Sequence, residues 1–270
     1  MQMTKISGPM HTEKCGIKTW RQFARRVRPR GCRLLNRLDR FPKSVLVTGC
    51  QRSGTTMLSR VITLSDGMTN YWFGKDDELD AALILAGEVE LDAPGRFCFQ
   101  TTYLNECYRE YFEHDCGCRI LWVLRNPFSV VYSLMYNWRR WTLDELFKAC
   151  GAGFLDDRLA RRYRRFGPIA ISRLMKACLS YNGKVSQLFE LKERLDKDAV
   201  MVIEYDDLVN DPQRRLPKIY RFIDLDYQDR YCDHIHRKST GKKNRLSNRE
   251  RNIVDQLCLP VYEKAKGLLD

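Results

Sequence analysis

The sequence contains no apolar run that approaches the roughly 18 residues of a membrane span. Its longest apolar stretches, such as residues 120–124, have the length of a strand. The first residues include no apolar core of a secretory signal peptide, and the odd number of 11 cysteines favours a reduced compartment, so we expect a cytoplasmic protein. Neither the four histidines nor the close pair Cys116 and Cys118 belongs to a cluster at zinc-ligand spacing, so no metal is expected.

Charge is distributed unevenly over a chain that is otherwise ordinary in composition. Hydrophobic residues make up 44% of the 270 positions, which is enough for a sizeable core and excludes general disorder. Residues 1–43 hold twelve Lys and Arg against Glu13 and Asp39, so they carry +10 of the net +13. We predict a basic, solvated and partly helical extension over residues 1–41, followed by one domain over 42–270. The extension is a candidate contact for an anionic surface or partner, whereas the nearly neutral domain is not expected to bind nucleic acid.

Short apolar segments alternate with segments of helical pattern. Because the apolar segments do not alternate polar and apolar residues, they are typical of buried parallel strands. We predict strands over residues 44–48, 96–102, 119–124 and 199–205. We predict helices over residues 56–64, 77–86, 127–141, within 155–195, after Pro212 and after the capping box Ser247–Glu250. This order predicts an α/β fold: a three-layer sandwich with a mostly parallel central sheet and helices on both faces.

The most informative segment is Gly49–Thr56, which reads GCQRSGTT between the first strand and a helix. Such a loop directs backbone N–H groups and a helix N-terminus at an anion. Gly49 and Gly54 have the spacing of a P-loop, but Thr55 stands where a Walker lysine would be, and the nearby cation is Arg52. The pattern argues against an ATPase or GTPase and favours a nucleotide with a single 5′ anionic group.

This loop resembles the 5′-phosphosulfate loop of the sulfotransferases that use 3′-phosphoadenosine 5′-phosphosulfate (PAPS). The R-S-G-T-T form is similar to that of bacterial, carbohydrate and tyrosylprotein members. The resemblance implies a P-loop-like sulfotransferase fold and a set of residues that hold the 5′ side of the donor: Arg52, Ser53, Gly54, Thr55 and Thr56.

Three later segments extend the resemblance to about residue 243. Arg125 ends a strand and Ser133 follows eight residues on, as in the family's pair for the 3′-phosphate, with Ser129 as an alternative. The segment 203–208 resembles the family's Y-E-D-L strand end and places Tyr205 near the adenine. The basic segment 236–243 is similar to the late loop that closes over the 3′-phosphate, through Arg237 and Lys238.

The resemblance implies in-line transfer of a sulfuryl group to a hydroxyl or amine, without metal, leaving 3′-phosphoadenosine 5′-phosphate (PAP). Arg52 would stabilise the leaving phosphate. The cytosolic enzymes have a histidine base in a K-T-H string, but the comparable string here is residues 100–102, Gln-Thr-Thr. Other branches use a carboxylate after the first helix. The candidate bases here are Glu78 and Asp77, with Asp76 as a third, unless these acids only cap a helix.

Two other functions compete with this one: a P-loop nucleotide kinase or NTPase, and an inactive sulfotransferase-like binding protein. The acceptor is a small molecule or a glycan, and without a membrane anchor we favour a small alcohol, phenol, amine or natural product. Gln100, Thr101 and Tyr103 are candidates for the acceptor pocket. The basic segment 158–165 is either a solvated helix face or a contact for an acidic glycan.

Overall fold

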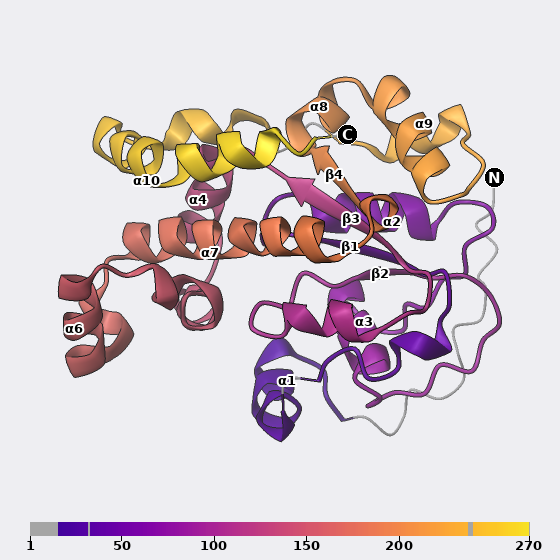
Figure 1. Cartoon of the computed structure of the whole chain (residues 1–270), viewed down its shortest axis with the longest axis horizontal. Coiled ribbons are helices and arrows are strands. Elements are labelled where there is room, and N and C mark those ends of the chain that lie inside the picture. Colours follow the sequence, from indigo (N-terminus) through magenta and orange to yellow (C-terminus); the bar gives the residue numbers. More distant parts are fainter. Residues whose placement is uncertain (1–15, 32, 237–239, 270) are drawn as a thin grey trace.

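The computed structural model describes residues 16–31, 33–236 and 240–269. Its centre is a four-stranded, fully parallel sheet with the order β2-β1-β3-β4 (Figure 1). The strands are β1 (Val45–Gly49), β2 (Cys98–Gln100), β3 (Arg119–Leu124) and β4 (Val200–Glu204). The carboxyl ends of parallel strands meet at one edge of the sheet, so the loops after all four strands converge there.

Helices cover both faces of this sheet. Alternate strand residues pack on one face against α2 (Thr55–Thr63), α8 (Tyr205–Asn210) and α9 (Pro212–Phe222). The other face packs against α3, α4, α7 and α10. These run over Asp77–Leu85, Pro127–Tyr136, Arg173–Arg194 and Asn248–Lys266. The predicted three-layer α/β sandwich is therefore confirmed. None of the helices in the described ranges is long and apolar enough to cross a membrane.

Several predicted boundaries are wrong. The helix predicted over 127–141 ends at Tyr136, and a separate helix, α5, covers Arg140–Leu146. The predicted helical region 155–195 is two helices, α6 (Asp157–Phe166) and α7, because Gly167–Ala170 forms a 3₁₀ turn between them. The second strand is shorter than predicted. The capping box at Ser247–Glu250 does begin the last helix, as expected.

The basic N-terminal segment is part of the core. It forms α1 (Trp20–Arg26) and buries Ile17, Phe23, Val27, Leu34, Leu35, Leu38 and Phe41. Several of its arginines pair with acids of the domain: Arg28 with Glu106 at 2.7 Å, Arg30 with Glu88 at 2.6 Å and Arg40 with Glu90 at 2.7 Å. The expectation of a solvated extension is therefore wrong for residues 17–31 and 33–41, because their apolar side chains are buried in the core and several of their arginines pair with acids.

Candidate active site

The loop after β1 is shaped by its two glycines. Gly49 has a φ of +144°, and a Cβ there would lie 2.4 Å from the carbonyl oxygen of Val123. Gly54 has a φ of +104°, and a Cβ there would lie 2.3 Å from the ring of Tyr205. No other residue fits either position without moving backbone or ring. The loop therefore requires both glycines of the P-loop spacing.

Internal hydrogen bonds stabilise the loop, and backbone N–H groups at the start of the next helix remain as donors for a ligand. Ser53 is fully buried and its hydroxyl donates to the carbonyl of Cys50 at 2.6 Å, so this side chain stabilises the loop. Arg52 has a left-handed backbone with a φ of 74°, a strained conformation for a residue with a Cβ. The helix α2 begins at Thr55. Its first hydrogen bond runs from the Met57 N–H to the N-cap carbonyl of Gly54 at 3.1 Å, so the N–H groups of Thr55 and Thr56 precede the helical hydrogen bonds. These groups suit an anion.

Two arginines meet next to the loop. The Nε of Arg52 donates to the Ser133 hydroxyl oxygen at 3.0 Å, and Arg125 donates to the carbonyl of Arg52 at 3.1 Å. The Arg125 guanidinium lies 4.0 Å from the centre of the Tyr205 ring. Burial lowers the pKa of both guanidinium groups, yet each stays a cation because arginine titrates far above neutral pH. The pair forms a cationic wall.

The residues of this cationic wall and their neighbours differ in whether they reach the cavity. Arg52, Arg125 and Tyr205 line the cavity, whereas Ser133 is fully buried and does not. Ser133 accepts from Arg52 and from Asn137, at 3.3 Å, which leaves its own O–H to donate. Tyr205 begins α8 rather than ending a strand, and only 3% of it is exposed. Its ring is covered by Arg125 and Gly54, so its direct effect is to orient Arg125.

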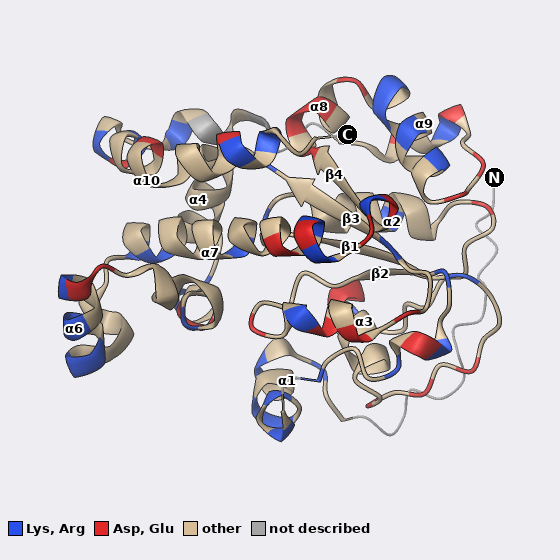
Figure 2. Ribbon diagram, viewed as in Figure 1, with Lys and Arg blue, Asp and Glu red and all other residues tan. Residues whose placement is uncertain are grey.

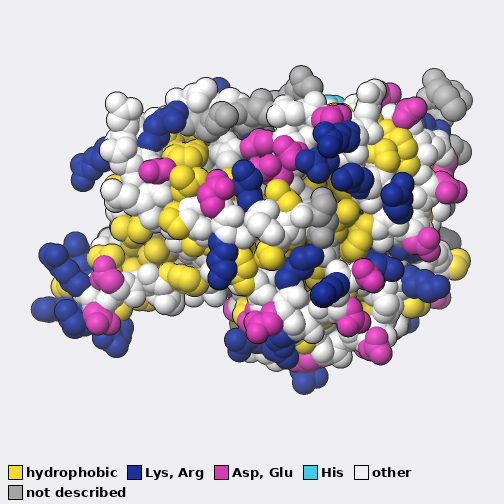
Figure 3. Space-filling view, turned by 45° about the horizontal axis from the view of Figure 1, so that its top comes forward, with side chains coloured by type: hydrophobic (Ala, Val, Ile, Leu, Met, Phe, Trp, Pro, Cys, Tyr) yellow, Lys and Arg dark blue, Asp and Glu magenta, His cyan; other side chains and the backbone are white. Residues whose placement is uncertain are grey.

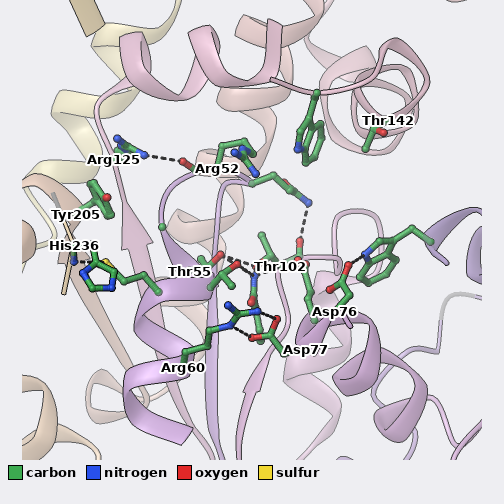
Figure 4. A pocket seen from close by; sticks show the side chains of 18 of the residues that line it. Arg52, Thr55, Arg60, Asp76, Asp77, Thr102, Arg125, Thr142, Tyr205 and His236 are labelled. Atoms are coloured by element: carbon green, nitrogen blue, oxygen red, sulfur yellow. Dashed lines mark hydrogen bonds and ion pairs between the residues drawn. The ribbon is translucent and has the colours of Figure 1, made fainter. Parts of the chain in front are cut away.

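Across the cavity, the acids at the start of α3 have different partners. Asp76 is the N-cap of the helix: its Oδ1 accepts from the Leu79 N–H at 3.2 Å, and its Oδ2 accepts from the Trp20 indole at 2.9 Å. Asp77 is 6% exposed and accepts two bonds from Arg60, at 2.9 and 3.1 Å. Both carboxylates are therefore occupied by structural contacts (Figure 4).

Glu78 is the third acid and has a different environment. Burial, followed by repulsion from Asp76 and Asp77, raises its pKa to about 8. Its Oε2 accepts from the Gln100 amide at 3.2 Å. The pKa of Glu78 is therefore matched to proton transfer near neutral pH.

Gln100 links this acid to the phosphate loop. Its amide nitrogen lies within hydrogen-bond distance of the hydroxyls of Thr55 at 3.0 Å, Thr56 at 3.1 Å and Thr102 at 3.4 Å, as well as of Glu78. An amide has only two N–H donors, so these acceptors share them. This linking position is not visible in the sequence, where Gln100 is only a candidate for lining the pocket.

The loop, the two arginines and the acids surround one cavity of about 570 Å³. Figure 4 shows Arg52 and Arg125 on one side, Asp76 and Asp77 on another, and Thr55 between them. The volume falls in the range of ligand pockets. His236 also lines it, whereas Arg237 and Lys238 lie outside the described residues. Trp20 and Arg60 also line the cavity but could not be predicted from the sequence, where each is only an aromatic or basic residue in a helical segment.

A second hollow of about 120 Å³ adjoins the first. The two share Trp20, Gln51, Glu78, Trp138 and Thr142, so Glu78 lies at their junction. Two buried polar atoms on this side have no hydrogen-bond partner within the described ranges: the Tyr103 hydroxyl and the Gln51 Oε1. Burial of a polar atom without a partner is costly, so both atoms are suited to meet a ligand.

Known proteins with similar sequence or structure indicate the family of the chain. A family model described as a sulfotransferase domain matches residues 109–257, more than half of the chain. A sulfotransferase from Alicyclobacillus acidocaldarius is similar in structure, with a TM-score of 0.52 and 15% identity over 84% of this chain and 95% of that chain. A sulfotransferase domain from the curacin biosynthetic pathway has a TM-score of 0.51 and 14% identity, over 85% and 92%. The mouse sulfotransferase SULT7A1 complexed with PAP has a TM-score of 0.48 and 16% identity, over 87% and 92%.

No curated protein matches the chain. At these identities the solved structures show the fold alone, and that fold is the one the sequence predicted. The family model adds the activity class, and the resemblance found in the sequence is confirmed at the level of the family; the R-S-G-T-T branch stays a prediction. The chain belongs to the sulfotransferase family and is a transferase enzyme.

Proposed function

We propose that this sulfotransferase uses PAPS as its donor and a small molecule as its acceptor. The observation that carries the proposal is a single cavity with two arginines and a phosphate loop on one side and Glu78, whose pKa is raised to about 8, on the other. PAPS, when bound, supplies the sulfuryl group, and PAP leaves. The transfer requires a site that binds an anionic donor and a base that removes the proton of the attacking hydroxyl or amine.

The donor side fits a nucleotide with phosphates at both ends. Gly49 and Gly54 leave no room for a Cβ, which brings the loop backbone close to a ligand. In the proposal the N–H groups at the start of α2, with the hydroxyls of Thr55 and Thr56, hold the 5′ side. Arg52 stabilises charge that develops on the leaving phosphate.

The other end of the donor would contact Arg125. Tyr205 covers one face of that guanidinium, and Ser133 holds Arg52, so both residues orient the cationic wall. We keep the 3′-phosphate as the proposed ligand of Arg125, with Tyr205 as the residue nearest the base. Ser133 belongs to the same proposed phosphate site but lies behind Arg52, so its contribution is to hold Arg52. Arg237 and Lys238 remain proposed contacts of the 3′-phosphate.

Glu78 is the proposed general base. It faces both hollows, and neither of its neighbours competes well for the role: Asp76 caps α3 and Asp77 is paired with Arg60. Burial, and after it the negative charges of these two acids, hold the pKa of Glu78 high. Asp76 and Asp77 therefore act as positioning residues in this proposal.

The second hollow supports an acceptor that inserts one ring. Its volume of about 120 Å³ compares with the cavity of about 150 Å³ that holds a benzene molecule. Phe23, Tyr103, Trp138 and Trp141 provide aromatic walls. A ring that carries the reacting hydroxyl or amine toward Glu78 and a further polar group for Tyr103 fits this lining.

Calorimetry tests the donor. PAP without metal should bind the wild-type protein, and Arg125→Ala should weaken binding by about 2 kcal/mol or more, the scale of a lost charged hydrogen bond. ATP with Mg²⁺ serves as the comparison. No binding of PAP, with ATP bound instead, would exclude PAPS as the donor.

A further inference from the structure

The helix α6 carries an unusual concentration of unpaired positive charge. Five of its ten residues are exposed arginines, and its only acid is Asp157. Four N-terminal arginines form ion pairs with acids, but no ion pair within the described ranges involves these five: Arg158, Arg161, Arg162, Arg164 and Arg165. Their charge is therefore presented to the outside rather than used inside the fold.

Exposed apolar side chains gather at both ends of the same helix. The described residues include six exposed large hydrophobic side chains, and three of them lie within sixteen positions here: Phe154 at 46%, Phe166 at 55% and Ile169 at 74%. Single exposed apolar residues are ordinary, but here half of the six fall within one short segment.

These apolar residues are not displaced members of a core. The inner side of α6 is already packed, because Leu159 and Tyr163 contact the small cluster of Phe147, Ile171 and Leu179. The helix is thus anchored by one set of apolar residues, and a second set remains in solvent. Figure 2 shows α6 standing out from the body with its blue segments, and Figure 3 shows the dark blue cluster with yellow beside it at the same end of the molecule.

We propose that this surface, residues 154–169, docks on an anionic lipid membrane. Lipid phosphates complement the five arginines, and the interface between headgroups and acyl chains accepts Phe154, Phe166 and Ile169. A glycan or nucleic acid would satisfy the arginines but would leave an isoleucine that is 74% exposed without a partner. A partner for this surface must offer both negative charge and an apolar environment. A lipid surface offers both, so it fits best. This inference is independent of the proposed donor and acceptor.

The number of charges gives the expected loss of membrane binding when arginines are removed. A basic residue next to an anionic lipid surface contributes about 1 kcal/mol, which is about fivefold in binding. Loss of two arginines should therefore weaken binding about 25-fold. The contribution of the arginines to binding should fall with added salt, whereas the contribution of the apolar side chains should not.

The test is cosedimentation of the full chain with vesicles of phosphatidylcholine alone or with about a third phosphatidylglycerol. We expect binding only to the anionic vesicles. R161Q/R164Q should weaken it about 25-fold, and F166S/I169S should weaken it at least fivefold and remove the part that survives high salt. All four side chains point into solvent, so circular dichroism and thermal melting should match the wild type.

A matched control comes from α9. Arg214 and Lys218 are also exposed and basic, but the six exposed large hydrophobic residues include none in that helix. R214Q/K218Q should change vesicle binding less than twofold. Equal losses in the α6 and α9 variants would overturn the proposal, because they would indicate attraction by net charge alone. So would retention on heparin that R161Q/R164Q abolishes, together with no binding to anionic vesicles, which would make the partner a polyanion.

Discussion

The indole Nε1 of Trp20 donates a hydrogen bond of 2.9 Å to Asp76 Oδ2, across 56 positions of sequence. Trp20 belongs to the basic N-terminal segment, and Asp76 caps the helix that carries Glu78. The Trp20 ring also lies 5.4 Å from the centre of the Phe23 ring and 5.7 Å from that of Tyr103. The N-terminal segment therefore builds a wall of the site, and removal of residues 1–43 would open the core rather than detach a targeting arm.

Trp20→Phe should keep the ring contacts and remove this hydrogen bond. Asp76 is partly exposed, so water can replace the indole, and we expect a loss of about 1 kcal/mol in the free energy of unfolding, measured with urea. Trp141→Phe is the matched control because that indole also lines the second hollow but is 41% exposed. The free energy of unfolding of Trp141→Phe should differ from that of the wild type by less than about 0.5 kcal/mol. Equal effects of the two substitutions would contradict a specific role for the Trp20–Asp76 bond.

The rate should depend on pH through Glu78. A base must be deprotonated to act, so with a pKa of about 8 the value of kcat/KM should rise about tenfold per pH unit below pH 8 and level off above it. Glu78→Gln should lower kcat by about 10²- to 10⁴-fold and remove this dependence. Asp77→Asn removes one of the charges that raise the pKa, so its pH profile should move to lower pH. An unchanged profile in Glu78→Gln would assign the base elsewhere.

The same residue should destabilise the fold as pH rises. Glu78 titrates near its usual value of 4.5 when unfolded and at about 8 when folded. Between these values the folded state holds more protons than the unfolded state, so stability falls with increasing pH. Glu78→Gln removes this effect. Its melting temperature should equal that of the wild type at pH 4, exceed it increasingly up to about pH 8, and then keep a constant excess. A constant difference over the whole range would show that the acid titrates normally.

The layers and the phosphate loop could be predicted from the sequence because each has a local cause. Buried parallel strands are continuous apolar runs, and Gly49 and Gly54 occur where a turn requires them. The helix break after Phe166 was missed, although Gly167 and Pro168 mark it, because arginines and leucines on both sides have high helix propensity.

The site was harder to predict where it depends on contacts between distant segments. The sequence brought Asp76, Asp77 and Glu78 together but could not rank them, because their partners Trp20 and Arg60 come from other helices. The N-terminal segment was wrongly predicted to be solvated, for a related reason. Charge counted within one segment says nothing of the acids, such as Glu88 and Glu106, that pair with it after folding.

Tyr103→Phe tests whether the second hollow recognises the acceptor. The Tyr103 hydroxyl is buried without a partner within the described ranges, so its removal should leave stability equal or slightly higher in urea unfolding. Binding of PAP should not change, because Tyr103 lies outside the larger cavity. With single-ring phenols as acceptors, KM should rise for those with a second polar group and stay constant for phenol itself. A uniform change for every acceptor would place Tyr103 in the scaffold of the hollow, whereas a selective change identifies its hydroxyl as a contact of the acceptor.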